Sequence, residues 1–246
     1  MNPDDAATPT GRDDPAASAS AVPHASTGRV RHWVGMAVLA VVLMLLLRAL
    51  VAQSFFVPSG SMQPTIEPGD RLLANRLVRG DSVRRGDIVV FDGARAFGPD
   101  NPAGGSAGAT DQVRRLLGSI LSIDSGTDYV KRVIGAPGDH VVCCDPSGRL
   151  VVNGIAVDEP YLYPGDRPSE LTFDVTVPTG RIWVMGDHRS DSSDSRAYLG
   201  HAGGGMVRLD DVIGQASVRY WPLGGLGTLG DAGALSTVAS MPGAGH

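Results

Sequence analysis

Lysine is almost absent from this 246-residue chain. The sequence carries 21 basic residues, of which 20 are arginines and one, Lys131, is a lysine. Arginine keeps its charge in a protein, whereas a buried lysine can lose its proton. The single lysine therefore indicates either a surface position left by a biased composition or chemistry that arginine cannot perform. Composition alone leaves both interpretations open.

An excess of positive charge is also missing. The 21 basic residues are outnumbered by 26 acidic ones, which gives a formal net charge of −5. Nucleic-acid-binding proteins usually carry a basic surface that attracts phosphates. We therefore expect no nucleic-acid partner.

Cysteine occurs only twice, at the adjacent positions Cys143 and Cys144. This spacing matches neither a zinc site nor a conventional disulfide framework. A ring between the two neighbours could close in an oxidising compartment. We interpret the pair as two small thiols that are buried or lie at a sheet edge.

Long apolar runs are scarce, and only one could cross a membrane. Residues 33–47 contain no charge, and a helix over about 30–51 is long enough to span a bilayer. Arg29 and Arg31 precede the run and favour a cytoplasmic N-terminus, although Arg48 weakens that asymmetry. A cleaved signal peptide is the alternative. We predict a single-pass membrane protein.

The composition shifts along the chain and indicates four regions. Residues 1–28 have few large apolar side chains, so we predict a disordered cytoplasmic tail. Residues 29–52 form the predicted transmembrane helix, and residues 53–222 form the outer domain. Residues 223–246 are rich in Gly and Ala and are predicted to be a flexible tail.

The outer domain is predicted to be mostly β. Short segments rich in Val, Ile and aromatic residues, bounded by Gly, Pro or Asp, are typical of strands; they cover 87–91, 129–135, 140–144, 149–154, 171–177, 181–186 and 214–222. Helical spacing of apolar residues appears once, over 110–123. It lies in an apparent insertion of about 93–126, so we predict a short helix there.

A stiff serine-bearing stretch follows the apolar run. VPSGSMQPTIEPGD, residues 57–70, contains three prolines and can be neither an ordinary helix nor an interior strand. A nucleophilic serine needs a base and donors for the oxyanion that forms. Either His188 or Lys131 could be that base. Lys131 lies in an apolar segment, where burial would lower its pKa.

Four ordered motifs resemble those of bacterial type I signal peptidases: residues 54–70 (SFFVPSGSMQPTIEPGD), 84–91 (RRGDIVVF), 128–139 (DYVKRVIGAPGD) and 185–200 (MGDHRSDSSDSRAYLG). The resemblance implies a membrane-bound endopeptidase that removes signal peptides from exported proteins, with an antiparallel β-rich catalytic domain outside the bacterial cytoplasmic membrane. It implies no metal and no cofactor. The implied partners are signal peptides, the lipid bilayer and, as a further candidate, the export translocon.

The resemblance also assigns roles to individual residues. Ser61 would be the nucleophile and Lys131 the general base, and the Ser59 hydroxyl with the Ser61 amide would form the oxyanion hole. Ser192 would orient the lysine amine. The supporting residues of the same motif would be Asp187, Arg189, Asp194 and Arg196, with His188 as a polar structural residue rather than a base.

Substrate preference follows from the same resemblance. The family cleaves after small residues in an Ala-x-Ala pattern, because shallow pockets exclude larger side chains. An extended substrate would add to a strand edge. The residues that match or adjoin the family's pocket positions are Phe55, Val57, Pro58, Met62, Ile66, Leu72, Tyr129 and Val130. The competing interpretation is that most of them are core residues, Ile66 and Leu72 above all.

Three other functions compete with this one. Penicillin-binding and β-lactamase-like hydrolases place a lysine three residues after the serine, and Pro64 occupies that position here. A membrane-anchored β-domain could bind exported or cell-wall ligands without catalysis. An inactive relative is the third possibility, but Ser61, Lys131, Ser192 and Asp194 are all intact.

Overall fold

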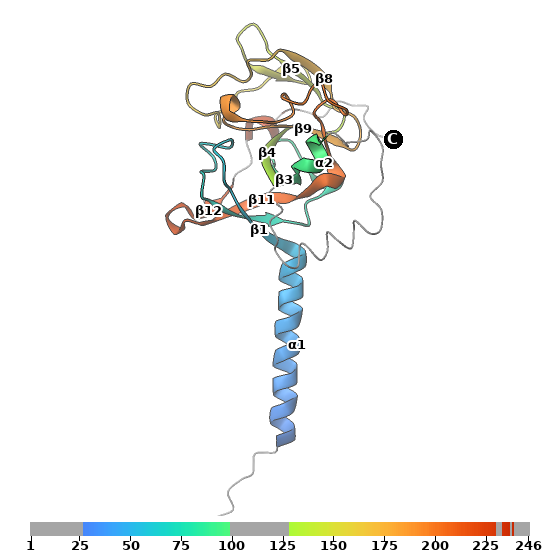
Figure 1. Ribbon diagram of the computed structural model, residues 1–246, viewed down its shortest axis with the longest axis vertical. Helices are drawn as coiled ribbons and strands as arrows, with labels where there is room; N and C mark the ends of the chain where they lie inside the picture. The colour runs from blue at the N-terminus through green and yellow to red at the C-terminus, as the bar shows by residue number, and fades with distance from the viewer. Residues whose placement is uncertain (1–26, 99–127, 230–232, 237, 239–246) are drawn as a thin grey trace, which may run out of the picture. The chain divides into compact units, whose positions relative to one another are not determined.

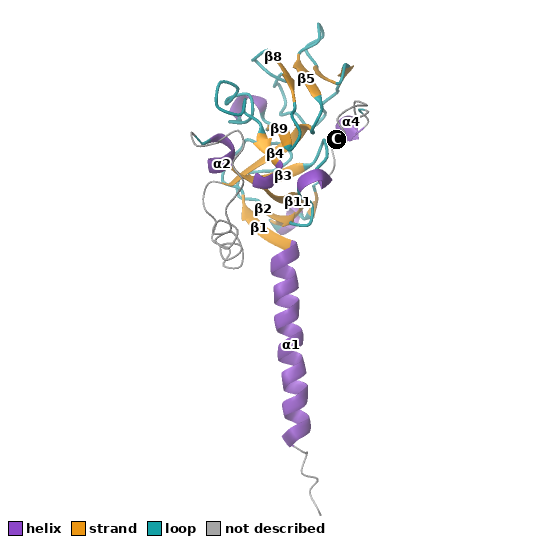
Figure 2. Ribbon diagram, turned by 90° about the vertical axis from the view of Figure 1, so that its right-hand side faces the viewer, coloured by secondary structure: helices purple, strands orange, loops and turns teal. Residues whose placement is uncertain are grey.

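The computed structural model describes residues 27–98, 128–229, 233–236 and 238. The chain divides into two units, residues 1–44 and 45–246. Helix α1 covers Thr27–Val51, two residues earlier than the predicted 29–52 at its start and one residue shorter at its end (Figures 1 and 2). Within the residues whose side chains the structure describes, no helix is long and apolar enough to cross a membrane.

The four motifs lie on strands of the larger sheet or on the loops that follow them. Its strands follow the order β1-β2-β11-β3-β4-β9-β10, with β12 paired to β11, and every pair is antiparallel (Figure 1). Their bounds are β1 Ala52–Phe56, β2 Arg71–Asn75, β3 Ile88–Asp92, β4 Asp128–Gly135, β9 Arg181–Met185, β10 Val207–Arg208, β11 Val212–Trp221 and β12 Gly227–Thr228.

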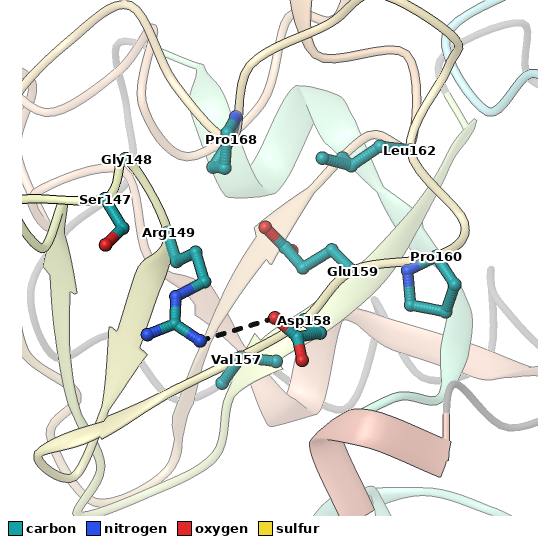
Figure 3. A pocket seen from close by; sticks show the side chains of 9 residues that line it. All are labelled: Ser147, Gly148, Arg149, Val157, Asp158, Glu159, Pro160, Leu162 and Pro168. Carbon is teal, nitrogen blue, oxygen red and sulfur yellow. Dashed lines mark hydrogen bonds and ion pairs between the residues drawn. The ribbon is translucent and has the colours of Figure 1, made fainter.

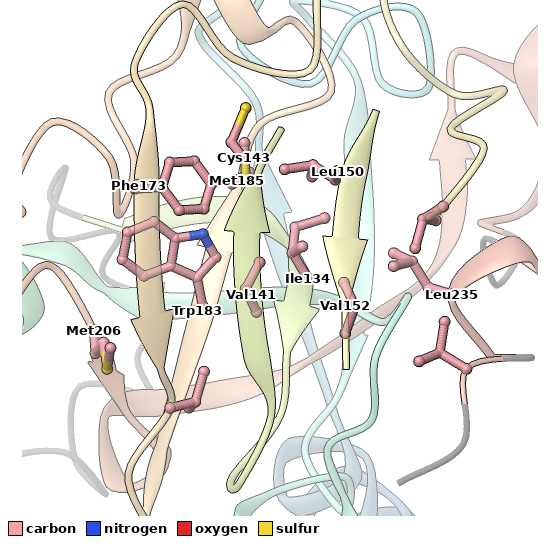
Figure 4. Close-up of a cluster of buried hydrophobic side chains, with 13 residues drawn as sticks. Ile134, Val141, Cys143, Leu150, Val152, Phe173, Trp183, Met185, Met206 and Leu235 are labelled. Atoms are coloured by element: carbon pink, nitrogen blue, oxygen red, sulfur yellow. The ribbon is translucent and has the colours of Figure 1, made fainter. Parts of the chain in front are cut away.

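The second sheet has four antiparallel strands in the order β7-β6-β5-β8. Its strands are β5 His140–Cys143, β6 Leu150–Val152, β7 Ile155–Ala156 and β8 Phe173–Thr176. A buried cluster joins it to β4 and β9. In that cluster Trp183 packs on Phe173 with ring centroids 5.1 Å apart (Figure 4).

Both sheets bear out the prediction of a mostly β, antiparallel domain. All seven predicted strands are present, with ends shifted by a few residues. The sequence analysis missed β1, β2, β7, β10 and β12. In β2 the buried Leu72 and Ala74 alternate with more exposed neighbours, which is the strand period.

After α1, the helices that the structure describes are short. They are α2 Gly93–Phe97, α4 Gly233–Ser236 and the single-turn 3₁₀ helices η1 Gly80–Ser82, η2 Arg189–Asp191, η3 Leu209–Asp211 and η4 Leu223–Gly225. Helix α2 lies at the start of the predicted insertion. The helix predicted over 110–123 lies outside the described residues, as does the predicted disordered tail up to residue 26.

The C-terminal region differs from the predicted flexible tail. Strand β12 pairs with β11, and the side chains of Leu235 and Val238 are 0% and 3% exposed within the buried cluster of Figure 4. Burial of apolar side chains against the sheets stabilises this part of the chain. A Gly- and Ala-rich composition did not reveal two isolated apolar anchors.

The two cysteines are joined rather than free. A disulfide links Cys143 to Cys144, so the interpretation as two thiols is wrong. Cys143 is buried in the cluster that joins the sheets, and Cys144 packs against it. Ring closure between neighbours was the alternative that the spacing had left open.

Candidate active site

The serine-bearing stretch is a closed loop between β1 and β2. The Val57 amide donates to the Asp70 carbonyl at 3.0 Å, and the Gly69 amide donates to the Val57 carbonyl at 2.8 Å, so the loop is tied at its base. Met62 and Ile66 are 1% and 0% exposed and anchor the loop in a buried cluster. A loop held at its base and by its apolar side chains can hold a hydroxyl in a fixed position.

Ser61 and Lys131 lie together although 70 positions separate them in the sequence. The Lys131 Nζ donates to the Ser61 Oγ at 2.5 Å. Lys131 lies on β4, opposite Val89 of β3. Both groups are buried, with Lys131 3% and Ser61 8% exposed to solvent. Burial lowers the pKa of Lys131 to about 8, and the charges of Asp194 and Asp187 oppose that shift. A neutral amine beside a hydroxyl can accept its proton.

Ser59 lies on the exposed side of the same loop. Its Oγ is 3.4 Å from the Ser61 Oγ. A second hydroxyl this close to the nucleophile can donate to an oxygen that forms at the attacked carbon. The geometry is compatible with the role that the resemblance implies.

Asp194 is the centre of the supporting motif. Its carboxylate is 0% exposed and accepts hydrogen bonds from the Arg196 guanidinium at 2.8 and 2.9 Å, the Ser192 Oγ at 2.7 Å and the Gly186 amide at 3.0 Å. Burial raises the pKa of Asp194, but the hydrogen bonds and charge of Arg196, together with the bonds from Gly186 and Ser192, lower it overall. The carboxylate is therefore a fixed negative charge near Lys131.

Ser192 has a different partner from the one predicted. Its hydroxyl donates to Asp194, and among the described side chains no hydrogen bond joins it to the Lys131 amine. Ser192 thus contacts the carboxylate whose charge acts on the Lys131 amine, and its predicted role in orienting the amine stays a prediction.

Asp187 connects the loop that carries Ser61 to β4, the strand that carries Lys131. Its carboxylate accepts two hydrogen bonds from the Arg132 guanidinium, at 2.8 and 2.6 Å, and one from the Thr65 hydroxyl at 2.6 Å. Arg132 directly follows Lys131 on β4, and Thr65 lies four residues after Ser61. The buried pair therefore fixes the Ser61 loop relative to β4.

Two residues beside Arg189, Glu159 and Tyr161, were not predicted from the sequence. The Arg189 guanidinium forms an ion pair with Glu159 at 2.5 Å, and both side chains are nearly fully buried. Tyr161 donates its hydroxyl to Glu159, and its ring lies 4.2 Å from the Arg132 guanidinium. Glu159 and Tyr161 lie outside the four motifs, and nothing in their local sequence indicates that they are buried beside two arginines.

The predicted substrate residues divide into two groups. Ile66 and Leu72 are 0% exposed and pack in one buried cluster, so the core interpretation holds for them and no surface remains for a peptide. The same cluster buries three more of the predicted residues, Phe55, Val57 and Met62. Pro58 is exposed, and Tyr129 and Val130 are partly exposed, so these three remain accessible.

A separate pocket of about 530 Å³ lies at the second sheet and contains neither Ser61 nor Lys131. Its lining includes the Arg149–Asp158 pair, 3.5 Å apart, and Glu159 at its wall (Figure 3). Within the part of the chain that the structure describes, no cluster of His, Cys, Asp and Glu side chains could hold a metal ion.

Comparison with known proteins places the chain in one family. The family model described as signal peptidase, peptidase S26, matches residues 30–221. A probable signal peptidase I of Mycobacterium leprae is 34% identical over 229 residues, which cover 79% of this chain and 78% of the relative. A signal peptidase I of Leptolyngbya laminosa is 33% identical, with 91% and 95% covered. One from Bacillus licheniformis is 37% identical, with 78% and 88% covered. The chain therefore belongs to the signal peptidase family, peptidase S26.

Proposed function

We propose that the chain is a serine endopeptidase that cleaves N-terminal signal peptides from exported preproteins by means of a Ser61–Lys131 dyad. Membership of the signal peptidase family supports the reaction and the substrate class. The observation that carries the dyad is the 2.5 Å contact between the Lys131 Nζ and the Ser61 Oγ, made by an amine whose pKa burial lowers to about 8.

The proposed reaction has two halves. The Ser61 Oγ attacks the scissile carbonyl carbon while its proton passes to the Lys131 Nζ. The Ser61 amide and the Ser59 hydroxyl hold the resulting oxyanion. The carbon–nitrogen bond then breaks, and Lys131 gives its proton to the leaving amine. Water next attacks the acyl-serine with Lys131 again as the base, which releases the signal peptide and restores both groups.

We further propose that the substrate is an extended peptide with small residues before the cleaved bond. Of the predicted substrate residues, Pro58, Tyr129 and Val130 have accessible side chains. Tyr129 and Val130 precede Lys131 on β4, so a peptide beside this strand would present its carbonyl to the dyad. Small residues suit a surface of this kind because a larger side chain would clash.

Residues 29–52 are proposed to anchor the enzyme in the bacterial cytoplasmic membrane, with the N-terminus cytoplasmic. Large apolar side chains of α1 from Trp33 to Leu45 are about half or more exposed, and a bilayer is the environment that such a surface fits. Extraction of membranes at alkaline pH tests the anchor. We expect the full chain to stay in the membrane pellet, and its release into the supernatant would contradict the proposal.

Cleavage of a preprotein with an Ala-x-Ala site tests the activity. We expect the full-length, detergent-solubilised protein to yield mature product, and Ser61→Ala and Lys131→Ala to yield none above background. Lys131→Arg should be equally inactive, because arginine cannot serve as a neutral base.

Two outcomes of the cleavage assay would argue against this proposal. Normal activity of Lys131→Arg would exclude the neutral-amine mechanism. Tight binding of the preprotein without any cleavage would favour the non-catalytic binding domain instead.

A further inference from the structure

His188 contacts the nucleophile loop twice. Its backbone amide donates to the Ser61 carbonyl at 3.1 Å, and its ring Nδ1 lies 3.3 Å from the Gly60 carbonyl oxygen. Because a carbonyl oxygen can only accept, the ring nitrogen must carry the proton of this bond. The ring also stacks on Tyr163, with centroids 3.9 Å apart and planes inclined by 14°, which fixes its orientation.

The Gly60 carbonyl matters because of what lies on the other side of the same peptide group. A trans peptide is planar, so its C=O and the following N–H point in opposite directions and turn together. The N–H that follows the Gly60 carbonyl is that of Ser61, the backbone donor proposed for the oxyanion. A group that fixes the Gly60 oxygen therefore also fixes the direction of the Ser61 N–H.

The Gly60 carbonyl has two partners. The Gln63 amide donates to it at 2.9 Å within the loop itself, whereas His188 comes from the loop that follows β9. The local bond moves with the nucleophile loop, so it cannot set the orientation of that loop against the rest of the site. Among the described residues, the bond from His188 is the one hydrogen bond that relates the Gly60 carbonyl to the supporting motif that holds Asp194.

We propose that His188 is a positioning residue for the oxyanion hole, acting through the Gly60–Ser61 peptide plane. The proposal rests on the proposed peptidase function for its kinetic consequence, but the contact itself does not. An oxyanion exists only after attack, so a group that aims its donor acts on the transition state and not on substrate binding.

A matched pair of substitutions isolates the ring nitrogen. In His188→Leu a methyl group replaces Nδ1 at the same distance from Cβ, and the donor is lost. In His188→Asn an amide nitrogen can take that place and donate. Both variants lose the stack on Tyr163 and keep the backbone amide, so they differ mainly in the one hydrogen bond.

We expect His188→Leu to lower kcat for preprotein cleavage about tenfold or more while KM stays within about twofold. His188→Asn should restore most of the lost kcat. The control is His140→Leu, which removes a histidine paired with Asp174 in the second sheet and should cleave like the wild type. Equal kcat in His188→Leu and the wild type, or an equal loss in His188→Asn and His188→Leu, would overturn the proposal.

A second measurement does not depend on activity. The amide resonance of Ser61 in the full-length protein reports the hydrogen bonding of its peptide group. We expect it to shift in His188→Leu relative to His188→Asn, and an identical position in the two would contradict the proposal. If the wild type cleaves no preprotein, the proposed function fails, whereas the amide resonance still decides the role of His188.

Discussion

At the scale of single residues, the chemistry depends on the environment of one amine. Lys131 lies on β4, which pairs with β3 on one side and with β9 on the other. Alternation places Lys131 and Arg132 on opposite faces of the strand. Both are nevertheless buried, because each face of this strand is covered. Arg132 forms an ion pair with Asp187. The Lys131 amine has the Ser61 hydroxyl as its partner instead, and it is the group that can lose its proton.

The lowered pKa of Lys131 predicts how activity depends on pH. Only the neutral amine can take the Ser61 proton, and its fraction grows as pH rises through the pKa. We therefore expect kcat/KM to rise between about pH 6 and pH 9 with a midpoint near 8, the value to which burial lowers this pKa. Peptide cleavage measured over that range checks the prediction.

A control separates Lys131 from effects on the substrate. The same profile measured with a substrate that lacks titratable side chains should have the same midpoint. A profile that is flat from pH 6 to pH 9, or a midpoint near 10.5, the ordinary lysine value, would contradict a buried neutral base.

At the scale of elements, the site is made where two loops touch. The loop after β1 carries Ser61, and the loop after β9 carries residues 186–192. Gly186 of the second loop lies against the Ser61 carbonyl of the first. A Cβ at this position would lie 2.4 Å from the Ser61 carbonyl oxygen and 2.3 Å from the Ser192 Oγ. A glycine is required here because two loops occupy the space that a side chain would need.

Substitution of that glycine should separate the loops and inactivate the enzyme. We expect Gly186→Ala to lower kcat about 100-fold, because a displacement of about 1 Å between reacting groups has an effect of that size. Preprotein cleavage with purified full-length variants measures it.

Gly200→Ala is the matched control for this prediction. No atom lies within 4 Å of the Cβ that alanine would add there, so its activity should equal that of the wild type. Wild-type kcat in Gly186→Ala would show that the two loops have room to separate without loss of the site.

At the scale of the whole catalytic unit, the two sheets share a core that reaches the C-terminal region. The cluster around Trp183 includes Ile134 of β4, Val152 of β6 and, from beyond β12, Leu235. Arg85 extends the connection, because its guanidinium pairs with Asp139 at 2.7 Å and also donates to the Val238 carbonyl. Leu235 and Val238 thus belong to the folded unit.

Truncation of one of these anchors should destabilise the fold. Leu235 is 0% exposed, so we expect Leu235→Ala to lower the free energy of unfolding by about 2–5 kcal/mol, the usual effect of removing a buried leucine side chain. Urea or thermal unfolding of the full-length protein measures the change.

Leu226→Ala is the comparison for this prediction. The Leu226 side chain is 64% exposed, and its removal should change stability by less than about 0.5 kcal/mol. Equal stability of Leu235→Ala and the wild type would mean that the C-terminal anchor contributes nothing in solution.

Most strands of the unit could be predicted, because strand signals are local. The apolar, β-branched content of β4 and β9 is visible within a few residues. Strand β1 was not predicted because it begins directly after the apolar helix. Strand β12 was not predicted because a strand of two residues shows no periodicity. The assignment of Ile66 and Leu72 to a substrate pocket failed because both are fully buried. The sequence does not distinguish an apolar side chain that faces a substrate from one that faces the core.

The sequence by itself determined the chemistry that is available. It supplied a Ser-Gly-Ser stretch, a single lysine in an apolar strand and four ordered motifs, all of which are properties of short segments. Only the tertiary structure decided how those groups act. Burial sets the pKa of Lys131, and Gly186, His188 and the Glu159–Arg189 pair act through contacts between distant segments. Such contacts depend on which elements pack together, and local sequence does not carry that information.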